Sequence, residues 1–287
     1  MPTRRGKTIA LVVGAVALAF VAVAVWLGWP HLRFRWRFEP LGPNACGLPE
    51  YRHRQTGIIF VRLPGGTFWM GAQKTDPKGQ NYDPDAASDD GPVHEVELSP
   101  FVIGKYEVSQ AEWVRVMGSN PSHHEGEDSP VDSVSWDDCK EFCRKTGLRL
   151  PTEAQWEFAC RAGTTTPFAF GTRITPEEAN YGGGDTLPTK IVAVTSLKPN
   201  GFGLHNMHGN VDEWCEDSYA PQFYASPEAS QKDPLRNSAA SDRLLRTLRG
   251  GSLFFDARYC TSASRKCGRE ESDGFSGGLR LAFYPLP

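Results

Sequence analysis

The chain of 287 residues is long enough for one large domain with an appendage, and 8 Trp, 16 Phe and a hydrophobic share of 39% can form a sizeable core. The 29 Gly and 22 Pro indicate a loop-rich fold. A net charge of -3, with Lys and Arg dispersed beyond residue 40, argues against a nucleic-acid partner.

The first element in the chain is an apolar run. Residues 9–29, from Ile9 to Trp29, include no charged side chain, and about 20 apolar residues can cross a bilayer as a helix. A short basic segment, 1–8, precedes the run as in a signal peptide, and Ala22 to Ala24 could be a cleavage site. Because the run continues to Trp29, an uncleaved transmembrane signal-anchor is favoured over a cleaved signal peptide.

Residues 30–56 are predicted to form a juxtamembrane linker, since prolines at 40, 43 and 49 interrupt any regular pattern. The stretch from His31 to Phe38 alternates arginine with aromatic residues. It fits two interpretations equally, a segment along the lipid headgroups or a solvated linker. Its arginines compete with the basic segment 1–8 under the positive-inside rule, so they weaken the assignment of orientation.

A domain is predicted from residue 57 to residue 285. Its first strands are Ile58 to Leu63 and Thr67 to Met70, and Pro64 to Gly66 between them is typical of a hairpin turn. Two further strands are predicted at His94 to Leu98 and Phe101 to Val108.

Three helices follow, and each begins with a capping box. The pairs that form these boxes are Ser109 with Glu112, Ser135 with Asp138, and Thr152 with Gln155, and glycines at 118, 147 and 163 mark the expected ends. Few helices, short strands and much irregular chain predict a single irregular, loop-rich α+β domain.

The densest motif is NGFGLHNMHGNVDEWCED, from Asn200 to Asp217. It is similar to the signature N-G-[YF]-G-L-x-[ND]-M-x-G-N-x-x-E-W of the formylglycine-generating enzyme family, also called sulfatase-modifying factors. Further stretches resemble this family in the same order: Leu63 to Gly71, Tyr106 to Ser109, Pro130 to Trp136, Arg149 to Glu157, Arg249 to Ser252 and Gly278 to Ala282. The resemblance implies a fold related to C-type lectins.

The resemblance also implies a copper site. Characterised enzymes of the family hold copper between two cysteines and oxidise a substrate cysteine to formylglycine with O₂, and Cu(I) prefers such soft thiolate ligands. Counted from Ser252, the second cysteine position falls on Cys260, but the first falls on Phe255, which cannot bind copper. In addition, Asp212 replaces a tryptophan that is common in the family signature.

A candidate pocket remains around these positions. Its predicted members are Ser252 and Cys260 as candidate catalytic residues, with Asp212, Phe255, Arg258 and Arg265 as pocket residues. Neighbouring arginines could make Cys260 a reactive thiolate. The alternative, which the sequence favours, is a buried and inert cysteine. A metal pair of Cys260 with Cys267 would require the loop to refold.

Structural calcium is a further implication of the resemblance. One site would use Asn200, Gly201, Gly203 and His205, largely through carbonyl oxygens, which suit a hard cation. A second would use Asn180, Tyr181 and Asp185. The seven cysteines are an odd number, so at least one thiol is free or pairs with another chain. The resemblance suggests a single disulfide, Cys160 with Cys267.

The resemblance favours a location outside the cytoplasm, and seven cysteines are compatible with an oxidising compartment. The favoured hypothesis is therefore a single-pass, extracytoplasmic, membrane-anchored protein whose groove binds a peptide, a glycan or a protein partner. The alternative is an active oxidase that uses copper and Cys260, with a sulfatase as its partner. The incomplete cysteine pair favours the binding or assembly module.

Overall fold

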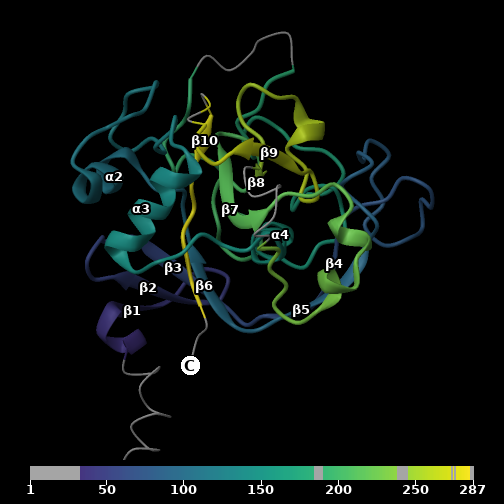
Figure 1. The fold of residues 1–287 in the computed structure, drawn as a ribbon, viewed down its shortest axis with the longest axis horizontal. Helices are drawn as coiled ribbons and strands as arrows, with labels where there is room; N and C mark the ends of the chain where they lie inside the picture. The colour runs from purple at the N-terminus through teal and green to yellow at the C-terminus, as the bar shows by residue number, and fades with distance from the viewer. Residues whose placement is uncertain (1–32, 184–189, 238–244, 273, 275, 285–287) are drawn as a thin grey trace, which may run out of the picture.

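A computed structural model of the chain describes residues 33–183, 190–237, 245–272, 274 and 276–284. Its largest sheet has five antiparallel strands in the order β1-β2-β3-β6-β11 (Figure 1). These strands are β1 (Phe38–Pro43), β2 (Pro49–His53), β3 (Ile59–Leu63), β6 (Phe101–Gly104) and β11 (Ala282–Phe283). The sheet thus joins the first described strands to the last.

A four-stranded sheet, in the order β10-β7-β8-β9, forms the other large layer. Its strands are β10 (Gly277–Gly278), β7 (Asp212–Ser218), β8 (Leu245–Arg249) and β9 (Lys266–Arg269). In Figure 1 these strands lie in the upper half of the molecule, while β1 and β2 lie near the bottom. The sequence motif that ends at Asp217 therefore supplies the strand β7 beside the candidate site.

The predicted hairpin between residues 58 and 70 is wrong. Both edges of β3 are occupied, by β2 and β6, so β3 has no edge left for the following strand. Instead β4 (Gly66–Met70) pairs with β5 (His94–Leu98) in a separate two-stranded sheet. Gly65, with φ +69, turns the chain out of the first sheet so closely to β5 that a Cβ there would lie 2.2 Å from the Leu98 carbonyl oxygen.

All three predicted helices form, as α2 (Gln110–Met117), α3 (Trp136–Thr146) and α4 (Glu153–Arg161), and each has its complete capping box. Helix α4 ends one residue earlier than predicted, because Ala162 adopts the left-handed conformation at φ 48. Short 3-10 turns lie at η1 (Phe223–Ala225), η2 (Pro227–Ser230) and η4 (Ala257–Tyr259). The capping chemistry therefore sets the beginnings of the helices as the sequence predicts.

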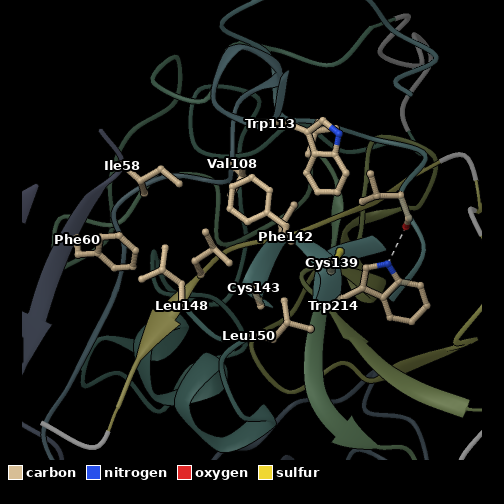
Figure 2. Close-up of a cluster of buried hydrophobic side chains, with 14 of the residues drawn as sticks. Ile58, Phe60, Val108, Trp113, Cys139, Phe142, Cys143, Leu148, Leu150 and Trp214 are labelled. Atoms are coloured by element: carbon tan, nitrogen blue, oxygen red, sulfur yellow. Dashed lines mark hydrogen bonds between the residues drawn. The ribbon is translucent and has the colours of Figure 1, made fainter. Parts of the chain in front are cut away.

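Two hydrophobic clusters make up most of the core. Figure 2 shows the first, in which side chains of α3 such as Phe142 and Cys139 pack with Trp113 of α2 and with Trp214 of β7. The indole nitrogen of Trp214 donates a hydrogen bond to the Val134 carbonyl oxygen at 2.9 Å, so its one polar atom is satisfied. The second cluster surrounds Trp156 of α4 and contacts the sheet of β4 and β5.

The predicted linker 30–56 is wrong from residue 33 onward. Phe34 and Phe38 are buried and stack with ring centroids 4.6 Å apart. Between them, Arg37 donates to the Gly147 carbonyl oxygen at 3.0 Å and so caps the end of α3. Pro40 and Pro43 lie in the edge strand β1, and Pro49 is the first residue of β2; both are positions where a missing N–H is tolerated.

The predicted membrane segment 9–29 lies outside the described residues. Among the residues that the structure does describe, no helix is both long and apolar enough to span a membrane.

Replacing Phe38 with alanine should lower the free energy of unfolding of the full chain by about 3–5 kcal/mol, because it removes a buried ring that packs on Phe60 and Phe283 and leaves a cavity. The matched control is Trp36→Ala, at a side chain that is 87% exposed, which should change stability by less than about 0.5 kcal/mol. Denaturant titration measures both. Equal, small effects would show that residues 33–43 do not belong to the folded domain.

Candidate functional site

The candidate site is built on the loop that follows β8. Gly250 and Gly251 both have positive φ, and a Cβ on Gly251 would lie 2.6 Å from the Cys260 sulfur, so only glycine fits here. Ser252 follows, fully buried, and its hydroxyl oxygen has no hydrogen-bond partner among the described residues. The turn therefore brings Ser252 and the Cys260 thiol to the same interior region.

Cys260 ends the short turn η4 and is fully buried. It packs with Phe168, Ile174 and Ala179, and its sulfur lies 3.7 Å from the Asp256 carbonyl oxygen. Burial, and next the carboxylate of Asp212, raise the pKa of the Cys260 thiol well above its usual range. Both effects favour the neutral thiol over the thiolate.

Phe255, in the same loop, is half-buried. The ammonium nitrogen of Lys266 lies 3.4 Å from the centroid of its ring, which is a cation–π contact. The same nitrogen donates to both carboxylate oxygens of Asp212 at 2.7 Å, and the Ser276 hydroxyl donates to Asp212 at 2.8 Å. Asp212, which replaces the expected tryptophan, therefore fixes the lysine that covers Phe255.

Lys266 was not among the predicted site residues. Because side chains alternate across a strand, its neighbour Cys267 points to the opposite face of β9. A metal pair of Cys260 with Cys267 is therefore not formed.

The predicted disulfide between Cys160 and Cys267 is also wrong, since all seven cysteines are free thiols. Cys160 is buried on α4, where its sulfur lies 3.6 Å from the Ser262 hydroxyl and within 4 Å of the ring of His208. Cys267 is exposed on β9. A buried thiol surrounded by other partners cannot reach an exposed one without rearrangement of the backbone.

The two predicted pocket arginines, Arg258 and Arg265, differ in their exposure and in their ion-pair partners. Arg258 is exposed and pairs with Asp256 at 2.7 Å. Arg265 does not face the pocket: its side chain is buried and donates to both carboxylate oxygens of Glu153, at 2.7 and 2.9 Å. Arg265 is therefore a structural residue, whose partner on α4 no short-range pattern in the sequence reveals.

The loop carries three aromatic side chains, Phe254, Phe255 and Tyr259, which we together call the aromatic platform. Phe254 is 52% exposed and Tyr259 is 43% exposed. The rings of Phe255 and Tyr259 meet edge to face, with centroids 5.8 Å apart. The charges beside them are paired, Lys266 with Asp212 and Arg258 with Asp256, so the surface is largely neutral.

A pocket of about 550 Å³ adjoins η4 on its outer side. Arg258 and Arg173 contribute cations to its lining, Asp83 and Asp85 contribute carboxylates, and Phe168 supplies an apolar wall. Because Phe168 also packs against Cys260, this pocket and the buried thiol share one wall. A ligand in the pocket would contact the protein without reaching the sulfur.

A buried polar cluster lies on the other side of β7. Glu107 accepts hydrogen bonds from the side-chain amides of Asn206 (2.7 Å) and Asn210 (3.0 Å), and Arg280 forms a bidentate pair with Glu213. Burial, and next the charge of Glu213, raise the pKa of Glu107 to about 8. The side-chain oxygen of Asn206 has no partner among the described residues.

A family model described as "Sulfatase-modifying factor enzyme 1-like domain" matches residues 46–284. The chain belongs to this family. The formylglycine-generating enzyme of Thermomonospora curvata is 30% identical to it, over 83% of this chain and 98% of that protein. The predicted family is therefore confirmed.

Solved structures agree on the fold. PvdO from Pseudomonas aeruginosa aligns with a TM-score of 0.69 at 24% identity, covering 81% of this chain and 97% of that one. Treponema denticola variable protein 1 aligns with a TM-score of 0.65 at 25% identity, covering 82% and 99%. The predicted α+β domain of the formylglycine-generating enzyme type is thus confirmed.

The oxygen atoms of Asn200 and the carbonyl oxygen of His205, predicted as calcium ligands, accept hydrogen bonds within the chain. The Asn200 side-chain oxygen already accepts hydrogen bonds from the backbone N–H groups of Phe202 and Leu204, at 3.0 and 3.1 Å. Its carbonyl oxygen accepts from Gly203, and the carbonyl oxygen of His205 accepts from Arg280. Asn200 and its glycines, including the exposed Gly201, therefore form a self-contained turn.

The second predicted calcium site is only partly described, because Asp185 lies outside the described residues. The side-chain amide of Asn180 donates to the Lys190 carbonyl and to the side-chain oxygen of Asn210. The hydroxyl of Tyr181 donates to the Ile174 carbonyl oxygen at 3.1 Å. Within the part of the chain that the structure describes, no three His, Cys, Asp or Glu side chains converge as metal ligands.

Alkylation of the folded full chain with a maleimide should modify Cys46 and Cys267, which are exposed, and should leave Cys260 unmodified until the protein is unfolded. Peptide mass mapping under non-reducing conditions measures this. Cys267→Ser should remove one of the two rapid modifications. Rapid modification of Cys260 would contradict a buried, neutral thiol.

The raised pKa of Glu107 predicts a pH dependence. Because the folded state binds this proton more tightly than the unfolded state, the stabilising effect is complete below the unfolded pKa of about 4.5 and is lost as the pH rises through about 8. Between pH 5 and 8, the wild type should lose stability relative to Glu107→Gln by up to about 1.4 kcal/mol per pH unit.

Denaturant titration at several pH values, in the presence of a chelator, measures this difference. The exposed residue Glu95 supplies the control, since Glu95→Gln should follow the wild type at every pH. Parallel curves for the wild type and Glu107→Gln would mean that Glu107 stays ionised in the folded protein.

Proposed function

We propose that this member of the sulfatase-modifying factor family is a membrane-anchored, extracytoplasmic binding or assembly module and not a copper oxidase. The main observation in support is the environment of Phe255. This residue stands where the family resemblance implies the first copper-binding cysteine, and the ammonium group of Lys266 covers its ring at 3.4 Å. Neither group is a ligand for Cu(I).

The surroundings of Cys260 support the same proposal. Its neighbours Phe168, Ile174 and Ala179 are apolar, and its thiol is neutral because of burial. Copper binding would require a thiolate in this apolar region, with the Asp212 carboxylate nearby opposing its negative charge. The site is therefore better suited to binding a ligand than to oxidising it.

The aromatic platform is the surface that we assign to ligand binding. Exposed aromatic rings provide large contact areas at a low cost in conformational entropy, and they are common among residues that dominate binding energy. The ion pairs around these rings can orient a polar ligand without favouring either positively or negatively charged ligands. A peptide, a glycan or a partner protein, including a sulfatase, would fit this surface.

Membrane anchoring rests on the sequence. The charge-free segment 9–29 is long enough to span a bilayer and stands directly before the folded domain. A domain anchored in this way acts on ligands near its own membrane, which suits assembly more than the processing of soluble substrates.

Structural calcium stays part of the proposal, at the ligands that the family resemblance implies. Asn200, Gly201, Gly203 and His205 would bind it largely through carbonyl oxygens, which suit a hard cation. Added calcium should raise the melting temperature of the chelator-treated full chain. An unchanged melting temperature would contradict the calcium proposal.

Binding is tested with peptide and glycan arrays, probed with the full chain in detergent. Array ligands that bind the wild type should lose about tenfold or more in affinity with the double variant Phe254→Ala, Tyr259→Ala, since two ring contacts of this kind contribute about 1–2 kcal/mol or more. Leu235→Ala, at another exposed hydrophobic side chain, is the matched control and should bind normally.

The enzyme alternative is tested in parallel. The full chain is incubated with Cu(I), a reductant and a peptide carrying the sulfatase motif Cys-x-Pro-x-Arg, and the peptide mass is measured. The proposal expects no conversion. Conversion of the cysteine to formylglycine that is abolished by Cys260→Ala would replace the binding module with a working oxidase.

A further inference from the structure

The folded domain begins unusually close to the apolar segment. Residue 33 is already helical, and Phe34 and Phe38 are packed into the core. Only residues 30–32 separate this packed stretch from Trp29, the end of the charge-free run. Four residue steps extend at most roughly 14 Å. If segment 9–29 spans a bilayer, even a fully extended connection therefore keeps Arg33 within about 10 Å of the headgroup layer.

The surface at this end of the domain carries exposed apolar groups. Trp36 is 87% exposed, although its neighbours Phe34 and Phe38 are buried. Leu41 is 39% exposed in β1, at an irregularity in the register between Pro40 and Gly42. Strand β1 is an edge strand of its sheet, so its outer side faces no other strand in the described structure. A tryptophan this exposed is typical of the interfacial residues of membrane proteins.

The charges around these groups are mainly positive. Arg33, Arg35 and Arg54 are exposed. The carboxylate of Glu39 is partly offset by Arg52, whose guanidinium lies 3.9 Å away. Each arginine near an anionic bilayer surface contributes about 1 kcal/mol of attraction. Charge complementarity therefore points to anionic headgroups as the partner of this surface.

We propose that a membrane-facing surface, made of Arg33, Arg35, Trp36, Leu41 and Arg54, lies in the headgroup region of the bilayer that holds segment 9–29. The inference rests on the proposed membrane anchor. Its consequence is a fixed orientation. Figure 1 places β1 and the helical residues 33–37 at the bottom, and β8 and β9, which flank the candidate site, in the upper half. The loop that carries the aromatic platform would thus lie at the end of the domain away from the membrane.

Tryptophan quenching tests this arrangement in the full chain, reconstituted into vesicles of phosphatidylcholine and phosphatidylglycerol that contain a lipid with a nitroxide on its headgroup. The emission that Trp36→Phe removes from the wild type reports on Trp36. This emission should lose about half or more of its intensity to the nitroxide, and less in vesicles without phosphatidylglycerol. The emission that Tyr259→Trp adds to the Trp36→Phe protein is the control and should remain unquenched.

Two different results would contradict the membrane anchor and the membrane-facing surface. If the full chain does not float with the vesicles after a carbonate wash, the anchor is wrong and the orientation falls with it. If the chain floats but the Trp36 emission is not quenched, or is quenched no more than the Tyr259→Trp emission, the anchor stands and the membrane-facing surface is wrong. Because Trp36 is so exposed, Trp36→Phe should leave the fold intact.

Discussion

A buried network of ion pairs between α4 and the site loop holds the candidate site in place. Arg249, the last residue of β8, donates to Glu153 at 3.0 Å and to Glu157 at 2.7 Å, and Arg265, just before β9, binds Glu153 from the other side. The loop 250–264 is therefore tied to one helix at both of its ends. Losing one partner of such a buried pair typically costs about 3–5 kcal/mol, because it leaves the other charge uncompensated.

This constraint explains how the site loop can keep its shape when a residue within it differs. The two arginines hold the ends of this loop through hydrogen bonds to Glu153 and Glu157, which involve neither Phe255 nor Cys260. The loop can therefore carry Phe255 where the family resemblance implies a cysteine. Lys266 follows Arg265 directly, so the same anchoring point positions the ammonium group that covers the Phe255 ring and pairs with Asp212.

Local signals in the sequence predict local structure well here. The capping boxes predict the first turns of all three helices, because the side chain and the backbone amide that it caps are three residues apart. Distant pairings are not readable in this way. The strands β1 and β2 look like a proline-rich linker until their partners are known. Arg265 looks like a pocket residue until Glu153, 112 positions away, is found beside it.

Copper binding tests the central claim most directly. The family resemblance implies a Cu(I) site with two cysteines, and this chain has Phe255 at the first of these two positions. Competition with a chromophoric Cu(I) chelator compares the full-length wild type with Cys260→Ser and Phe255→Cys. We expect the wild type to compete no better than Cys260→Ser, and Phe255→Cys to gain one tightly bound copper. Tight, stoichiometric copper in the wild type that Cys260→Ser abolishes would contradict this account.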